Sequence, residues 1–155
     1  MRTPSQTVGP YYVIGLVRRD ETGLAERTKP DAVELIGSLL DGQGAAINDG
    51  MIEIWDGTRW ARSGTDSEGR FSFTVTKPAP RPGEAPRFDV FVFARGLLRH
   101  QLTRIYFPDE PNESDPVFAS LEPEQRETLV GVAENGALRF DIRMQGDRAT
   151  VFFEH

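Results

Sequence analysis

The chain of 155 residues contains no cysteine, only two histidines and only three tyrosines. The absence of cysteine excludes disulfides, thiolate zinc sites, iron–sulfur clusters and cysteine nucleophiles. His100 and His155 form none of the H-x-H or H-E-x-x-H spacings of metal sites. The chain also lacks the G-x-S-x-G, G-x-G-x-x-G and Walker patterns. By itself, therefore, the sequence carries no self-contained catalytic or metal-binding constellation.

Long apolar runs and basic runs are missing as well. No stretch approaches the roughly 18 apolar residues of a membrane span, and the first residues lack the apolar segment of a signal peptide. The net charge of −6, without clusters of lysine and arginine, is typical of proteins that do not bind nucleic acid. We expect a cytoplasmic protein that has neither a nucleic acid nor a membrane as a partner.

Glycine and proline, by contrast, are plentiful: 15 glycines and 11 prolines are scattered between short apolar segments. Short strands separated by such turn residues predict an all-β fold, here a β-sandwich in one domain over residues 1–155. Asn135-Gly136 between two strand patterns is a strong hairpin signal, because both turn residues need positive φ. We expect about eight mainly antiparallel strands, at 33–40, 51–55, 70–75, 88–94, 102–107, 128–133, 137–144 and 150–153.

Three other segments do not read as strands. Residues 1–30 show little regular pattern and predict an irregular N-terminal arm, which in a compact protein is usually functional or bound to a partner. Pro123–Glu127 has the pattern of a helical turn. The acidic residues within 109–115 lack the spacing of a calcium loop, and the prolines around them predict a solvated loop.

Arg95 is the one residue whose position alone indicates binding. It follows a run of apolar residues, so it lies at the end of a core strand, where a guanidinium group can bind a carboxylate through two parallel hydrogen bonds. An internal salt bridge to Asp89 or Asp141 explains the same residue equally well. Trp55 and Trp60 are expected in core or interface packing.

Eight segments of the chain, taken in order, resemble the alpha chains of intradiol ring-cleaving dioxygenases of the protocatechuate 3,4-dioxygenase group. The resemblance runs from about residue 3 to the C-terminus, and its longest strings are the most specific. The segments are 3–11 (TPSQTVGPY), 29–32 (KPDA), 53–55 (EIW), 93–96 (FARG), 103–107 (TRIYF), 126–129 (RETL), 139–146 (RFDIRMQG) and 150–153 (TVFF).

The resemblance implies a β-sandwich subunit of an enzyme that cleaves protocatechuate with O₂ to 3-carboxy-cis,cis-muconate. In that family two tyrosines and two histidines of the beta chain hold a ferric ion, Fe³⁺. Here the strand that corresponds to the histidine strand, residues 87–91, has no histidine, and Trp60 falls near the first tyrosine position. The resemblance therefore implies a hetero-oligomer in which the partner beta chain holds the iron and this chain, alone, has neither metal nor catalytic residues.

The same resemblance implies a substrate-binding wall made of Thr7, Val8, Gly9, Pro10 and Tyr11, together with Arg95. Gly9 lets the backbone approach a flat ring, and Pro10 stiffens the segment. The Arg95 guanidinium suits the carboxylate that distinguishes protocatechuate from catechol. Two other hypotheses stay open. The chain is then either a structural partner that builds the oligomer without touching substrate, or a ligand-binding β-sandwich that has left the pathway.

Overall fold

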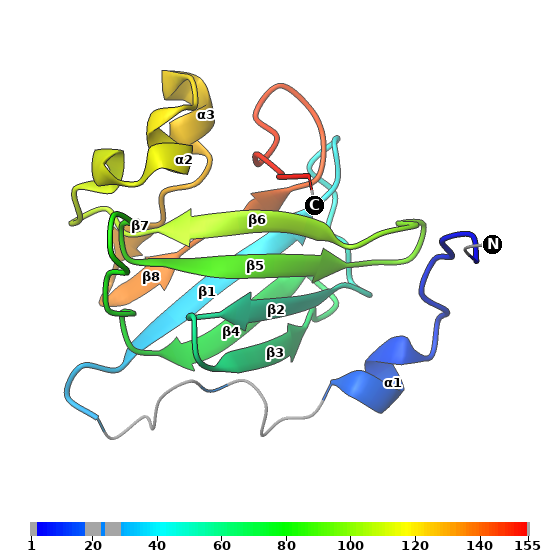
Figure 1. The fold of residues 1–155 in the computed structure, drawn as a ribbon. Coiled ribbons are helices and arrows are strands. Elements are labelled where there is room, and N and C mark those ends of the chain that lie inside the picture. Colours follow the sequence, from blue (N-terminus) through cyan, green and yellow to red (C-terminus); the bar gives the residue numbers. More distant parts are fainter. Residues whose placement is uncertain (1–2, 18–22, 24–28, 155) are drawn as a thin grey trace.

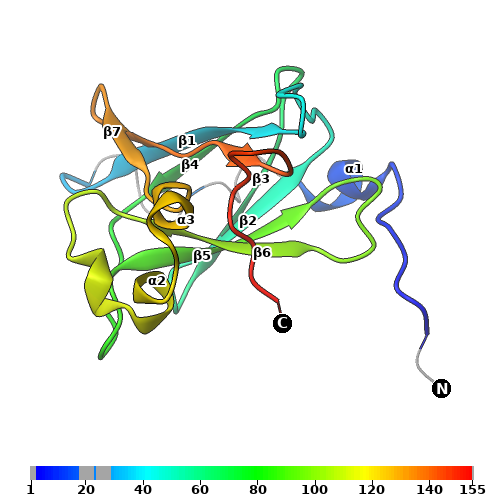
Figure 2. The ribbon, with the colours of Figure 1, turned by 90° about the horizontal axis from the view of Figure 1, so that it is seen from above.

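Two β-sheets packed face to face form the body of the molecule, in a computed structural model that describes residues 3–17, 23 and 29–154 (Figures 1 and 2). Most neighbouring strands are antiparallel, and β1 pairs in parallel with β8 and β9. The predicted all-β sandwich is confirmed. The first sheet has the order β4 (Arg70–Val75), β1 (Val33–Leu40), β8 (Ala137–Arg139) and β7 (Val132–Glu134), with β9 (Ile142–Arg143) pairing with β1; the second has the order β3 (Trp60–Gly64), β2 (Met51–Trp55), β5 (Arg87–Phe93) and β6 (Gln101–Tyr106).

The core lies between the sheets because every second side chain of each strand points inward. On β4 these are Phe71, Phe73 and Val75, and on β5 they include Val90 and Val92, all buried in a single apolar cluster. Each such side chain contributes about 1.5–3 kcal/mol of transfer free energy. The sandwich is therefore held by contacts that this chain makes with itself.

The predicted strands up to residue 107 are all present, the later two with ends shifted by a residue, but β3 (Trp60–Gly64) was missed. It pairs with β2 through a tight turn in which the Asp56 carboxylate accepts from the amides of Thr58 and Arg59, at 2.8 and 2.7 Å. Its inward residues are only Ala61 and Ser63, so the apolar alternation that marks a strand is weak here.

The C-terminal strands differ most from the prediction. The expected strand at 128–133 is wrong, since only Val132–Glu134 pairs as β7. The expected strand at 137–144 is split into β8 and β9 because the Asp141 carboxylate accepts from the Ser38 amide, at 3.0 Å, where a ladder bond would lie. Residues 150–153 form no strand, and one isolated bridge joins Phe153 to Leu102. The Asn135-Gly136 turn has the predicted positive φ at both residues.

Short helices lie at one end of the sandwich, and another short helix forms part of the arm. The predicted turn is α3 (Pro123–Glu127). The segment 109–115, expected to be a loop, contains η2 (Asn112–Ser114), and α2 (Pro116–Ala119) follows it without having been predicted. Asp115 is not solvated, because its carboxylate caps α2 by accepting from Val117 N at 2.9 Å. The arm, expected to be irregular, contains α1 (Tyr12–Leu16), and its residues 1–2, 18–22 and 24–28 lie outside the described ones. No helix in the described ranges is long and apolar enough to cross a membrane.

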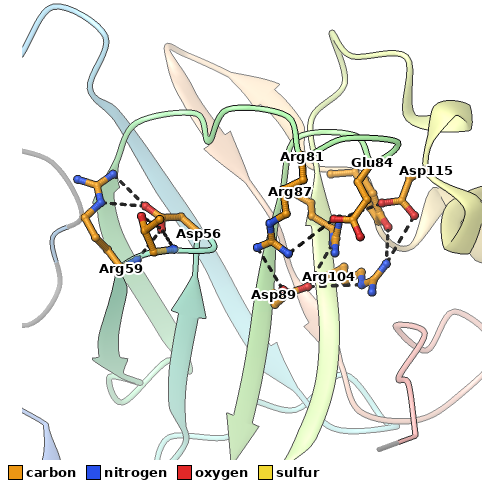
Figure 3. A network of polar contacts seen from close by, with 10 residues as sticks. Asp56, Arg59, Arg81, Glu84, Arg87, Asp89, Arg104 and Asp115 are labelled. Atoms are coloured by element: carbon orange, nitrogen blue, oxygen red, sulfur yellow. Dashed lines mark hydrogen bonds and ion pairs between the residues drawn. The ribbon is translucent and has the colours of Figure 1, made fainter.

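A network of ion pairs fixes α2 to the start of β5 (Figure 3). The Arg87 side chain is 4% exposed, and its Nη1 atom donates to Asp115 Oδ2 at 3.0 Å and to Glu84 Oε2 at 2.7 Å, while its Nε atom donates to Asp89 Oδ1 at 3.2 Å. Asp115 is 1% exposed. A buried charge is tolerated only with partners of this kind, so the network has a structural role.

Candidate functional site

The N-terminal arm lies along the end of the second sheet at which β5 leads into β6 (Figure 1). Val13 and Val17 of this segment lie within 4 Å of the position that a Cβ would take at Gly64, the last residue of β3. Arg62 Nη1 donates to the carbonyl of Leu16 at 2.7 Å. The small residue in β3 thus lets α1 pack closely against the edge of the sheet.

Two hydroxyl groups join the arm to the end of β5. The Tyr12 hydroxyl donates to the carbonyl of Asp49 and, at 3.3 Å, to that of Phe93. The Thr7 hydroxyl oxygen accepts from the amide of Gly96 at 2.9 Å. Gly96 has φ +89°, a conformation that other residues rarely adopt, and this turn is what aims its amide at the arm.

Arg95, between these two contacts, forms an ion pair through Nε with the Asp49 carboxylate. The internal salt bridge expected for Arg95 therefore exists, but with a different partner. Asp89 is paired with Arg87, and Asp141 with Arg139. The Arg95 side chain is 58% exposed, and its binding of a substrate carboxylate stays a prediction.

Tyr12 occupies a partly buried and charged position. Burial, with a further contribution from the negative charge of Asp49, raises the pKa of Tyr12 to about 12, and the positive charge of Arg95 opposes this. The phenol is therefore a hydrogen-bond donor at neutral pH, as its contacts with two carbonyl groups require.

An open groove with a volume of about 790 Å³ is lined by the arm, by the end of β5 with the loop that follows it, and by the C-terminal residues. The His100 ring lies against Phe91 and Phe93, with ring centroids 5.5 and 5.3 Å apart. Arg95 does not line this groove. It lines a second cavity of about 430 Å³, together with Met144, Gln145 and others. The groove is lined by Gln6, Val8, Phe93, Ala94, Leu97, Leu98, Arg99, His100, Gln101, Phe153 and Glu154.

The outer side of the arm is covered by no described part of the chain. A Cβ built on Gly9 meets nothing within 4 Å, so nothing described in this chain requires glycine there. Pro10 is exposed, and Tyr11 and Ile14 are 77% and 79% exposed. The structure thus brings Thr7 and Val8 to the end of β5 and leaves Gly9, Pro10 and Tyr11 facing outward.

The residues present do not fit a ferric site. In the described part of the chain, no three histidine, cysteine, aspartate or glutamate side chains come together in a group that could hold a metal ion. On the strand that corresponds to the histidine strand, Asp89 is taken up by ion pairs with arginines. Trp60, expected near the position of a ligand tyrosine, has its ring stacked against the Arg62 guanidinium, with 4.8 Å between Cζ and the ring centroid.

Sequence reasoning missed three residues of this region: Tyr12, Asp49 and His100. His100 has no metal-site spacing, and the signal that could have found it is its place just beyond the strand that carries Phe91 and Phe93. Asp49 lies in the Asn48-Asp49-Gly50 turn before β2, where an aspartate is ordinary. Its importance arises only from the fold, which brings it to Arg95 and Tyr12.

Comparison with known proteins gives a consistent result. No family model matches the sequence. The protocatechuate 3,4-dioxygenase alpha chain of Burkholderia cepacia is 37% identical over 191 aligned positions, which cover 99% of this chain and 97% of that one. The protocatechuate 3,4-dioxygenase alpha chain of Pseudomonas putida is 34% identical, with 98% and 96% covered.

Solved structures share the fold at lower identity. The dioxygenase domain of a carbohydrate-binding fusion protein from Streptomyces sp. SirexAA-E superposes with a TM-score of 0.65 and 22% identity, covering 93% of this chain and 98% of that one. Catechol 1,2-dioxygenase from Pseudomonas arvilla C-1 gives a TM-score of 0.61 at 19% identity, covering 80% and 55%. From the full-length likeness to the two curated relatives, this chain belongs to the family of protocatechuate 3,4-dioxygenase alpha chains, among the intradiol dioxygenases.

Proposed function

We propose that this chain is the alpha subunit of a protocatechuate 3,4-dioxygenase and that it completes the substrate pocket of an iron-bearing beta subunit. The complex would cleave protocatechuate with O₂ to 3-carboxy-cis,cis-muconate. The observation that carries this proposal is the likeness to alpha chains at 37% and 34% identity over nearly the whole chain. The described residues of this chain do not fit a ferric site, so the Fe³⁺ of the complex is assigned to the partner.

The exposed arm supports a binding role for its outer side. Tyr11 and Ile14, three positions apart in the arm, place large apolar side chains in solvent, as residues of an interaction site do. Gly9 and Pro10 lie beside them and would form a flat, stiff wall for an aromatic ring held by the partner. In this arrangement the arm orients the ring and excludes water, and it holds no reacting atom.

Arg95 is proposed to bind the substrate carboxylate. Its Nε is taken by Asp49, and in the described part of the chain no group pairs with its Nη atoms. A guanidinium with both Nη atoms open can still bind a carboxylate by donating two parallel hydrogen bonds to it. The proposal requires that the partner bring the substrate to the cavity that Arg95 lines rather than to the larger groove beside Val8.

The separation of these two cavities also favours a second candidate function. Val8 lines one hollow and Arg95 the other, whereas a substrate wall made of both would face one space. In that case the chain is a structural partner that builds the oligomer and makes no contact with substrate. Kinetics of the assembled complex distinguish the two.

The test uses the complex co-expressed with its beta chain, with Arg95→Ala and a matched Arg70→Ala control. Arg70 is equally exposed, at 59%, and is also paired with carboxylates, but it is the first residue of β4, in the other sheet. KM is measured for protocatechuate and for catechol, which lacks the carboxylate. Arg95→Ala should raise KM for protocatechuate by about 10-fold or more, the effect of losing a charged hydrogen bond of about 1.5–3 kcal/mol, and leave KM for catechol unchanged.

Arg70→Ala should change neither KM value. If Arg95→Ala also leaves KM for protocatechuate unchanged while changes at Thr7 or Pro10 only weaken assembly, the structural-partner function holds instead.

A further inference from the structure

One acidic residue outside the predicted wall connects both of its parts. Asp49 binds Arg95 through its carboxylate and the Tyr12 hydroxyl through its carbonyl oxygen. Tyr12 belongs to the arm, and Arg95 belongs to the turn after β5. Asp49 itself lies in the loop between β1 and β2, which is fixed to the sandwich by the bond from Gly50 N to Thr65 Oγ1 at 2.8 Å. Asp49 thus contacts both parts of the predicted wall, the arm and Arg95, from a loop that is bonded to the sandwich.

We propose that Asp49 is a positioning residue that sets the orientation of the Arg95 guanidinium and the place of the arm before any substrate binds. This inference rests on the proposed function for its consequence in the complex. We call Asp49, Arg95 and Tyr12 together the Asp49 latch.

The choice of atoms carries the argument. Asp49 pairs with Nε of Arg95, a residue that lines the second cavity, and in the described part of the chain no ion pair is formed by the Nη atoms. An arginine side chain that is 58% exposed would otherwise sample many rotamers, and ordering it on binding has an entropic cost. An ion pair made in advance lowers that cost, so it should act on substrate affinity more than on turnover.

The Tyr12 contacts extend the same effect to the arm. The phenol is held by two carbonyl groups, one from Asp49 and one from Phe93 at the end of β5. Its raised pKa, to which the Asp49 charge contributes, agrees with a carboxylate close to the ring. Residues 7 and 12 of the arm are therefore fixed on the two sides of Arg95, at Gly96 and at Asp49.

The experiment compares Asp49→Ala with Asp31→Ala, an exposed aspartate before β1 whose side chain has no hydrogen bond or ion pair with the described residues. In the co-expressed complex, Asp49→Ala should raise KM for protocatechuate by about 2- to 5-fold, the range of an exposed ion pair, with kcat and KM for catechol unchanged. The same substitution in an Arg95→Ala background should have no further effect on KM, and Asp49→Glu should restore part of the loss. Asp31→Ala should change nothing.

A second readout needs no turnover. Spectrophotometric titration of the full chain should show that the pKa of Tyr12 falls in Asp49→Ala and not in Asp31→Ala, with Tyr12→Phe used to assign the signal. An unchanged Tyr12 titration, or an equal rise in KM with and without Arg95, would overturn the latch. If the wild-type complex cleaves no protocatechuate, the proposed function fails, whereas the titration still decides whether the Asp49 carboxylate lies beside the Tyr12 phenol.

Discussion

At the start of β5 an arginine is buried among carboxylates, whereas just beyond the end of the same strand another arginine lies half exposed beside the arm. Arg87 is 4% exposed and its partner Asp115 is 1% exposed; Arg95 is 58% exposed and its partner Asp49 is 28% exposed. The first pair joins α2 to the sheet and is complete within the chain. The second is open on one edge, as a group that binds something else must be.

The difference extends to the sandwich and the arm as a whole. In the sandwich, small and apolar residues are explained by their neighbours: a Cβ on Gly37 would lie 1.9 Å from the carbonyl oxygen of Phe140. In the arm, Gly9 has no close neighbour, and Tyr11 and Ile14 are exposed. Residues that the chain itself does not explain are the ones we assign to the partner and the substrate.

The largest contrast is expected between Arg87→Met and Arg95→Met. Removing Arg87 leaves the buried Asp115 carboxylate with the helix amide that it caps and, among the described residues, only Arg104, at 3.6 Å, as an ion-pair partner. Breaking a buried pair in this way costs about 3–5 kcal/mol of unfolding free energy. Removing Arg95 should cost less than about 1 kcal/mol, because exposed pairs contribute little. Urea unfolding of the full chain measures both, and equal losses would show that the two pairs do not differ in kind.

A pair of glycine substitutions tests the same contrast in packing. Gly37→Ala should lower the free energy of unfolding by about 1–3 kcal/mol or more, since the added methyl group collides with backbone in the sheet. Gly9→Ala should change it by less than about 0.5 kcal/mol and show an effect only as a raised KM in the complex. A loss of stability in Gly9→Ala would mean that the arm is packed more tightly than described.

Exposed apolar residues of the arm should matter only for assembly. Tyr11→Ala and Ile14→Ala should each leave unfolding unchanged and weaken binding of the beta chain by about 30-fold, which corresponds to the roughly 2 kcal/mol of an interface hot spot. Val132→Ala is the control, because Val132 is 61% exposed on β7, in the other sheet. Titration calorimetry measures the three affinities, and equal values for all would remove the arm from the interface.

The smallest effects are those of pH on stability. They are expected at acid pH for the ion-pair network at the start of β5 and at alkaline pH for the arm. The hydrogen bond from Arg87 lowers the pKa of Glu84, so the stability this carboxylate contributes is present above its usual pKa and is lost as pH falls through the lowered value. Burial and the Asp49 charge raise the pKa of Tyr12 to about 12, so its contribution is present below pH 10 and is lost as pH rises toward 12.

The free energy of unfolding, measured across pH, should therefore depend less on pH at the acid end in Glu84→Gln. At the alkaline end it should depend less on pH in Tyr12→Phe. The acid limb is expected to stay unchanged in Tyr12→Phe. An alkaline limb that is the same with and without Tyr12 would contradict the assigned burial of its phenol.

The sandwich could be predicted because its signals are local. Alternation at Phe71, Phe73 and Val75 and the turn at Asn135-Gly136 each depend on neighbouring residues, and both are found where expected. The strand Trp60–Gly64 was missed because its inward residues are small, and the C-terminal strands were overestimated because the Asp141 side chain interrupts a ladder that backbone patterns alone would continue.

The candidate site could be predicted only in part, for the opposite reason. The resemblance gave Thr7 and Arg95, which the fold brings to opposite sides of one turn. Asp49 lies 46 positions from Arg95 and 37 from Tyr12, and no local pattern chooses it from the other aspartates in the chain. The expected partners of Arg95 were wrong because Asp89 and Asp141 pair with other arginines, whereas the fold brings the β1–β2 loop with Asp49 to Arg95.

The proposal that this chain completes the pocket of an iron-bearing beta chain is tested most directly by two measurements, oxygen consumption with protocatechuate and iron content. Both are made on this chain alone, on its beta chain alone and on the two co-expressed. We expect turnover in the co-expressed complex, with about one ferric ion per pair of chains, and neither iron nor turnover in this chain alone. Stoichiometric ferric iron with a tyrosinate charge-transfer colour in this chain alone, or a beta chain whose turnover is the same without this chain, would contradict it.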